Sequence, residues 1–196
     1  AGVCLGTLDV EGVNTQAYLS GTGGTATGNR LVLDHDAGFS ITKSCAADWH
    51  PEEFLLFQLL GNTLSFEVDL SGVGCACNLA LYLVQEPARN PSGIPSMGTC
   101  DFSPYYCDAN QVCGQWCPEL DIIEANNRVL AATPHKCDPA NEMGHYGSCD
   151  RAGCGSNTRT MGPNAYGPGS QFKINTQLPF TVSTSFSGDH AAGTFT

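Results

Sequence analysis

The sequence predicts an all-β protein, built as a sandwich or jelly roll, and three observations lead to this fold class. Short apolar segments recur along the chain between turns rich in glycine, of which there are 23. Several of these segments alternate apolar and polar residues, which is the period of a strand with one buried face. No stretch keeps a helical period over three turns. Short strands with glycine-rich turns are typical of two packed sheets.

The expected elements follow in chain order. Residues 1–30 predict turns and a short hairpin, because four glycines crowd its second half, and the next strand is expected to turn near Gly38. Residues 85–118 are rich in Pro, Gly, Ser, Tyr and Cys and predict a long loop, which is usually functional inside a compact domain. Strands are expected over residues 30–41, 53–60, 65–70, 75–84, 116–126, 172–175 and 180–186.

Length, net charge and hydrophobicity limit the kinds of partner that the protein can have. The 196 residues predict one domain over residues 1–196, with a core of useful size. The net charge of −11 would repel a phosphate backbone or an anionic membrane, so no nucleic-acid partner is expected. No apolar run approaches the roughly 18 residues that would insert into a bilayer. A neutral or cationic partner is therefore expected.

Eleven cysteines scattered among Gly, Asn and Pro predict a disulfide framework, which is typical of secreted proteins. A metal site would need cysteine pairs and histidines at ligand spacing, and the five histidines are spread too widely for one. We expect no metal and no cofactor. An odd number of cysteines leaves one thiol unpaired or paired outside this chain.

The stretch WCPELDIIEAN, residues 116–126, carries three carboxylates within six residues. In a regular strand Glu119 and Asp121 share a face, and Glu124 points to the other one. A β-bulge around Ile122 and Ile123 would bring Glu124 back to the face of Glu119. Crowded carboxylates repel one another, so we expect at least one to hold its proton near neutrality. General acid and base catalysis requires this arrangement, whereas the structural alternative is a solvated acidic edge.

The motifs ELDIIEAN, TPHKC, YGSCDRAGC and AYGPGSQFKINT, in this order, resemble glycoside hydrolase family 7, the cellobiohydrolases and endoglucanases. The resemblance runs through residues 45–186 and includes EFLLFQLLGNTLSFEVDLSGVGC and NLALYLV. The acidic motif alone would also suit family 16 of the same clan. Family 7 implies a curved, concanavalin-like β-jelly roll with a β-1,4-glucan along its concave face. Its catalytic domains are about twice this long, so the chain is expected to be part of one.

The resemblance implies residue roles. Glu119 corresponds to the nucleophile, Asp121 to the carboxylate beside it and Glu124 to the acid/base, in a retaining mechanism whose two carboxyl groups lie about 5–5.5 Å apart. Asp121 is expected to share a proton with Glu119 and to orient it. The expected substrate-binding residues are Asn78, Tyr82, Asp101, His135, His145 and Tyr146.

Disulfide pairings also follow from the resemblance. It implies Cys137–Cys149 and Cys100–Cys117, while Cys107 and Cys113 could close locally. It pairs Cys75 and Cys154 with cysteines beyond this chain. The sequence itself leaves every connectivity open.

Two functions are therefore expected. The first is a secreted, retaining β-1,4-glucan hydrolase, endo-acting with an open cleft, because the loop between Cys107 and Cys113 is shorter than in the family. The alternative is a catalytically inactive extracellular protein that binds glycan or self-assembles into a structure. Ala152, Gly155, Ser156 and Thr160 favour it, because they replace the family's acidic, aromatic and arginine side chains at the product sugars.

Overall fold

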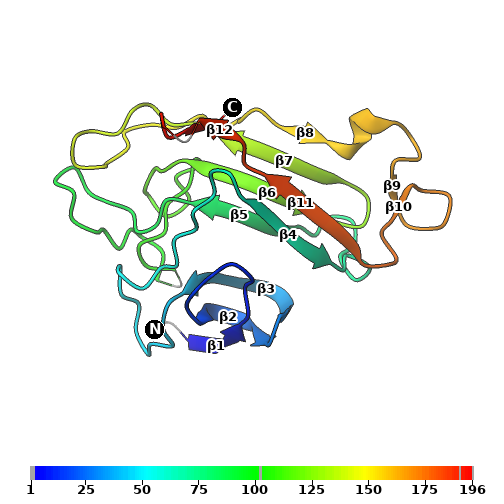
Figure 1. The fold of residues 1–196 in the computed structure, drawn as a ribbon, viewed down its shortest axis with the longest axis horizontal. Coiled ribbons are helices and arrows are strands. Elements are labelled where there is room, and N and C mark those ends of the chain that lie inside the picture. The colour runs from blue at the N-terminus through cyan, green and yellow to red at the C-terminus, as the bar shows by residue number, and fades with distance from the viewer. Residues whose placement is uncertain (1–2, 102, 190, 196) are drawn as a thin grey trace. The chain divides into compact units, whose positions relative to one another are not determined.

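The computed structural model describes residues 3–101, 103–189 and 191–195, and these are all-β apart from one short 3-10 helix (Figure 1). They fall into two compact units. The first unit comprises Ala1–Leu56, Val84–Pro118 and Cys137–Cys149. The second comprises Phe57–Leu83, Glu119–Lys136 and Asp150–Thr196. No helix among the described residues has the length and hydropathy needed to cross a membrane.

The first unit contains an antiparallel sheet of three strands, β1 (Val3–Leu8), β2 (Ala17–Thr27) and β3 (Arg30–Thr42), in that order. The turns expected around the glycines of residues 1–30 are wrong, because Gly21, Gly23 and Gly24 lie within the strand β2. Its glycines let neighbouring strands approach closely, since a Cβ on Gly21 would lie 2.1 Å from the carbonyl oxygen of Gly38. Glycine is thus used here for close packing and not for turning.

The turn expected near Gly38 is an irregularity of the β2–β3 pairing. Thr22 pairs with Gly38 and Gly24 with Leu33, so β3 carries extra residues between these partners. Asp36, among these extra residues, has a φ of 59°, in the left-handed region. The chain bulges out and then continues as the same strand.

The long loops of the first unit are held by disulfides. Cys4–Cys45 joins β1 to the segment after β3, and Cys137–Cys149 confirms the expected pairing. The expected Cys100–Cys117 and Cys107–Cys113 pairings are wrong: the structure pairs Cys100 with Cys113 and Cys107 with Cys117.

Backbone hydrogen bonds explain this exchange of partners. The amide of Cys117 donates to the carbonyl of Asp108 at 3.2 Å, which brings Cys107 beside Cys117. The buried carboxylate of Asp108 accepts the amides of Asn110 and Val112, and so wraps the chain between these two cysteines into a turn. The amide of Thr99 donates to the carbonyl of Cys113, which places Cys100 there. Sequence spacing carries none of this information.

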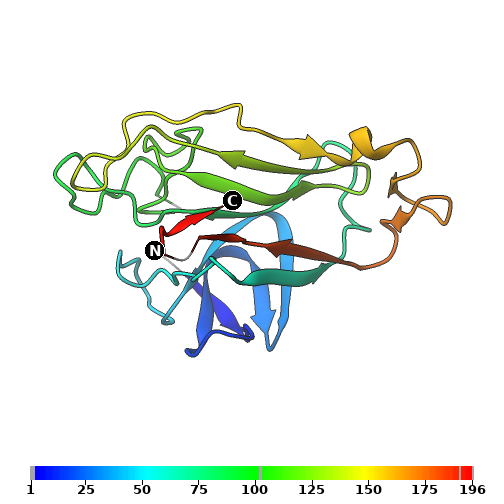
Figure 2. The same cartoon turned by 45° about the horizontal axis from the view of Figure 1, so that its top comes forward.

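The second unit contains two main sheets and two pairs of two-residue strands (Figures 1 and 2). In one, β4 (Thr63–Val68) pairs antiparallel with β11 (Phe180–Ser185). The other has the order β5 (Leu79–Val84), β6 (Glu119–Ala125), β7 (Leu130–His135) and β8 (Ser156–Asn157). The minor elements are η1 (Thr158–Met161), β9 (Tyr166–Gly167), β10 (Ile174–Asn175), β12 (Gly188–Asp189) and β13 (Thr194–Phe195).

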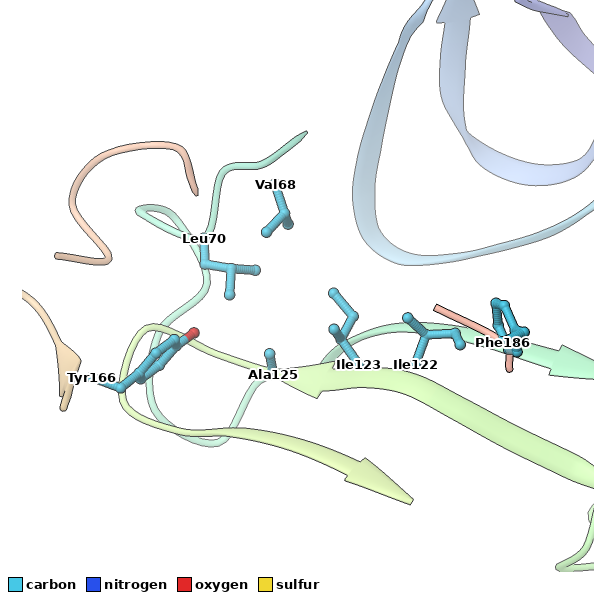
Figure 3. Packing of buried hydrophobic residues seen from close by; sticks show 7 residues of the cluster. All are labelled: Val68, Leu70, Ile122, Ile123, Ala125, Tyr166 and Phe186. Carbon is cyan, nitrogen blue, oxygen red and sulfur yellow. The ribbon is translucent and has the colours of Figure 1, made fainter. Parts of the chain in front are cut away.

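Apolar side chains from both sheets form the core of the second unit (Figure 3). Val68 of β4 and Leu70 just after it belong to the same cluster as Ile122 and Ile123 of β6. The cluster is completed by Ala125, Tyr166 and Phe186, with partly buried side chains of β5, β7 and β11 packed against it. Two sheets around one apolar layer are a β-sandwich, as predicted.

Three expected strands are shorter or absent. Residues 53–60 form only an isolated bridge, in which Phe54 pairs with Thr42 at the end of β3, and Leu56 is 68% exposed. The strand expected from Cys75 begins at Leu79, because the amide of Cys77 turns back onto the carbonyl of Gly74. The strand expected over residues 172–175 is reduced to β10.

Candidate active site

Strand β6 carries the β-bulge that the three carboxylates require. Glu119 pairs with His135 and Asp121 with Thr133, whereas Glu124 pairs with Ala131. Between these two pairs, Ile122 and Ile123 of β6 therefore run opposite a single residue of β7, Ala132. The extra residue restores the alternation, as the sequence predicted.

The bulge sorts the side chains of β6 between its two faces. The β7 partners of the three acids are residues 135, 133 and 131, which alternate regularly and so share one face. Ile122 and Ile123, although consecutive, both point into the core (Figure 3) and are at most 4% exposed. Glu119, Asp121 and Glu124 thus line the opposite surface. We call these three residues the carboxylate row.

Asp121 and His135 form a buried pair within this surface. The His135 Nε2 lies 3.2 Å from the Asp121 Oδ2, and both side chains are less than a tenth exposed. The His135 Nδ1 lies 2.7 Å from the carbonyl oxygen of Asp150. A carbonyl only accepts, so Nδ1 carries a hydrogen and the imidazole tautomer is fixed.

The contact between Asp121 and His135 therefore needs one shared proton. With Nδ1 protonated, a neutral His135 would turn its Nε2 lone pair toward a carboxylate, and these would repel. Burial opposes a charged imidazole, but the Asp150 carbonyl and the charges of Asp121 and Glu119 outweigh it and raise the pKa of His135. His135 therefore keeps its proton to higher pH than a free histidine, and the protonated Nε2 donates to the Asp121 Oδ2.

A glycine makes room for this histidine. Gly153 has a φ of +65°, and a Cβ there would lie 2.8 Å from the His135 ring and 2.5 Å from Thr133. Any larger residue would displace the loop whose Asp150 carbonyl fixes the imidazole tautomer. Sequence reasoning missed Gly153 and the Asp150 carbonyl, because neither a glycine nor a backbone group signals a catalytic role.

Glu124 is held by an amide. The Asn78 Nδ2 donates to the Glu124 Oε1 at 3.1 Å, so the structure brings these two predicted site residues together. Asn78 immediately precedes β5, the strand beside β6 in the sheet, and its side chain is exposed. Tyr82 lies within β5 and is 36% exposed. Half-buried Glu124 thus has one oriented oxygen and remains open to solvent.

Three other predicted substrate-binding residues belong to the first unit. Asp101 is exposed beside the Cys100–Cys113 disulfide. The His145 Nδ1 lies 2.7 Å from the carbonyl oxygen of Arg89, and the Tyr146 hydroxyl donates to the Gln85 Oε1 at 2.6 Å. Within their own unit, His145 and Tyr146 thus make contacts that hold loops in place.

The carboxylate row can support acid–base and nucleophilic chemistry. It offers three acids on one face, a shared proton on Asp121 and His135, and an amide donor on Glu124. Two carboxyl groups on one side of a bond are what hydrolysis of a glycosidic bond needs. Among the described residues, no group of three or more His, Cys, Asp or Glu is arranged to hold a metal ion.

The fold and the carboxylate row define a class, the β-jelly-roll proteins of glycoside hydrolase type. The model described as glycosyl hydrolase family 7 matches residues 106–196. Endoglucanase EG-1 of Trichoderma longibrachiatum is 32% identical over 199 residues, which cover 93% of this chain and 41% of the relative. Residues 106–196 thus match glycosyl hydrolase family 7, and the similarity to an endoglucanase extends over most of the chain.

Solved structures agree with this assignment. The native endocellulase EGI of Humicola insolens has a TM-score of 0.63 at 29% identity, over 88% of this chain and 49% of that one. A family 7 cellobiohydrolase of Daphnia pulex has a TM-score of 0.60 at 26% identity, over 84% of this chain and 48% of that one. They confirm the β-sandwich jelly roll. The chain spans less than half the length of these relatives.

Proposed function

We propose that the protein to which this chain belongs is a secreted, retaining β-1,4-glucan hydrolase that cuts within the polymer. The observation that supports it most is the bulge of β6, which aligns Glu119, Asp121 and Glu124 on one face while keeping both isoleucines buried. A solvated acidic edge needs no such device. Relatives named endoglucanases support the substrate class and internal cutting, as does the short loop between Cys107 and Cys113.

Each carboxylate has a distinct task in the proposed reaction. Glu119, ionised, attacks the anomeric carbon while Glu124, protonated, gives its proton to the leaving oxygen. The Glu119–sugar bond then breaks as Glu124 takes a proton from water, whose oxygen attacks the same carbon. Two inversions leave the anomeric configuration unchanged.

Asp121 and His135 act around Glu119. Glu119 lies opposite His135 in the ladder and shares its face with Asp121. The proton held between Asp121 and His135 offsets negative charge beside Glu119, which would otherwise resist ionisation next to a second carboxylate. We further propose that Asn78, Tyr82, Asp101, His135, His145 and Tyr146 bind glucan, and that both units belong to one domain of a longer protein.

The inactive alternative is not favoured. It was considered because Ala152, Gly155, Ser156 and Thr160 replace the family's product-binding side chains. Such replacements change how tightly a product binds, but they do not remove the catalytic carboxylates. The comparisons do not favour it either, since the relatives described above carry enzyme names. Neither self-assembly nor glycan binding alone explains an aligned carboxylate row beside a shared proton.

The test is release of reducing ends from soluble β-1,4-glucan by the full-length protein and by Glu119→Gln and Glu124→Gln. Both variants should lose about 10²–10⁴-fold in kcat. On a cellobioside with a nitrophenolate leaving group, Glu124→Gln should lose much less in the first step, because that group needs no proton. Glu119→Gln should stay inactive on both substrates.

Glu11→Gln is the matched control, since Glu11 is exposed in the first unit. It should leave turnover unchanged, and proton NMR of the first product should show the substrate's anomeric configuration. A folded wild-type protein with no turnover on any β-glucan would refute the proposal. Inversion at the anomeric carbon would refute the role of Glu119.

A further inference from the structure

One asparagine outside the carboxylate row uses all of its hydrogen-bonding groups. Asn126 follows directly after β6 and begins the turn to β7. Its Oδ1 accepts the amides of Arg128 at 2.8 Å and Val129 at 3.2 Å. Its backbone amide donates to the Val129 carbonyl, and its own carbonyl accepts the Tyr166 hydroxyl at 2.8 Å. These four bonds fix the side chain within the turn.

The remaining group of this asparagine reaches a different segment. The Asn126 Nδ2 donates to the carbonyl oxygen of Cys77 at 3.1 Å. Cys77 immediately precedes Asn78, whose amide holds the Glu124 Oε1. A second bond, from the amide of Asn127 to the Val73 carbonyl, attaches the start of the same segment. Residues 71–78 are thus tied to the β6–β7 turn at both ends.

We propose that Asn126 is a positioning residue that sets where the Asn78 amide meets Glu124. The chain from Asn126 through Cys77 and Asn78 to Glu124 consists of two hydrogen bonds and one peptide link. Asn78 is exposed and lies outside β5, so the strand ladder does not fix its backbone. This role rests on the proposed function, because it assigns Asn126 to the orientation of the acid/base.

The substitution Asn126→Asp distinguishes the bond to Cys77 from the bonds by which Asn126 holds the β6–β7 turn. An aspartate keeps the oxygen that accepts the Arg128 and Val129 amides, but turns a second oxygen toward the Cys77 carbonyl. The matched control is Asn175→Asp, because the Asn175 Oδ1 also accepts two amides, those of Gly169 and Gln177. Only Asn126→Asp removes the link to Cys77.

Losing one hydrogen bond of ordinary strength should change a rate or an opening equilibrium about tenfold. In the full-length protein, Asn126→Asp should therefore lower kcat about tenfold, with KM changed less than about twofold. Amide exchange in residues 71–78 should become about tenfold faster. Asn175→Asp should change neither.

A double-mutant cycle with Asn78→Ala completes the test. If Asn126 acts through Asn78, adding Asn126→Asp to Asn78→Ala should cost no further kcat. Additive losses, or an equal loss in Asn175→Asp, would overturn the proposal, and so would unchanged exchange in residues 71–78. A wild-type protein without turnover would refute the proposed function instead, and the exchange comparison would still decide whether Asn126 holds the segment.

Discussion

The two compact units are stabilised by different means. All four disulfides lie in the first unit, where they close loops around Cys107, Cys113 and Cys117, themselves at most 2% exposed. In one of its buried clusters, Cys107 and Cys117 pack with Ala88 in place of large apolar side chains. The second unit has the apolar layer of a sandwich, and its cysteines Cys75, Cys77 and Cys154 are exposed and unpaired among the described residues.

The carboxylate row therefore lies in the unit that has no disulfide among the described residues, so its geometry should not depend on whether the disulfides are oxidised or reduced. The carboxylate row stands on a strand whose other face is packed into the apolar layer, so burial of isoleucine fixes its geometry. The loops of the first unit depend on covalent links, because long loops bury too little apolar surface to order themselves.

Reduction should have the largest effect. With dithiothreitol, amide exchange in residues 97–117 should rise steeply, because each native disulfide in a secreted domain contributes about 2–5 kcal/mol. Residues 57–70 and 119–136 should keep their protection and serve as the internal control. Exchange mass spectrometry at increasing reductant measures both. If the two sets lose protection together, the units unfold as one and the comparison fails.

Truncation of the apolar layer should come next. Ile123→Ala should lower the free energy of unfolding by about 3 kcal/mol, since Ile123 is fully buried and the chain cannot collapse onto the cavity. The same substitution at Ile94, 61% exposed in the first unit, should change it by less than about 0.5 kcal/mol. Denaturant titration measures both. Equal losses would mean that the apolar layer is not what stabilises the second unit.

A carboxyl of the first unit should give the most specific effect, because it appears only between pH 4.5 and about 7. Burial raises the pKa of Glu86 to about 7, although the Ser40 hydroxyl donates to its Oε2 at 3.2 Å and opposes the shift. The residue is half-buried, but its Oε1 is shielded and has no hydrogen-bond partner among the described residues. Glu86 is therefore protonated in the folded chain at mildly acid pH.

The sign of this effect follows from proton binding. Between pH 4.5 and about 7 the unfolded chain releases the Glu86 proton and the folded chain keeps it, so stability falls as pH rises. The loss is up to about 3 kcal/mol and is complete above pH 7. Glu86→Gln should abolish this part of the pH dependence. Denaturant titrations from pH 4 to 8 measure it, and an unchanged slope in the variant would exclude Glu86 as its source.

Much of the site could be predicted because strand alternation is strict. Three acids at positions 119, 121 and 124 can share one face only with an extra residue, and two adjacent isoleucines mark where that residue stands. The physical cause is local to seven residues of one strand. That one carboxyl of the row holds a proton near neutrality remains a prediction.

What the sequence could not predict depends on contacts between distant segments. The disulfide partners follow from the turn that Asp108 makes, and the role of Asn126 follows from a bond across 49 residues. The strand expected over residues 53–60 is wrong because only Phe54 of this apolar run pairs with another strand, at the end of β3. Glu86 carried no signal in sequence, because its environment is made by β3, 46 residues earlier.

The bulge of β6 also decides which changes of length the carboxylate row can tolerate. Removing Ile123 would leave one residue between Asp121 and Glu124, so regular alternation would still place both acids on one face. Removing both isoleucines would instead turn Glu124 toward the apolar layer. A relative with one residue fewer in this interval should therefore keep its three acids aligned, whereas one with two fewer should not.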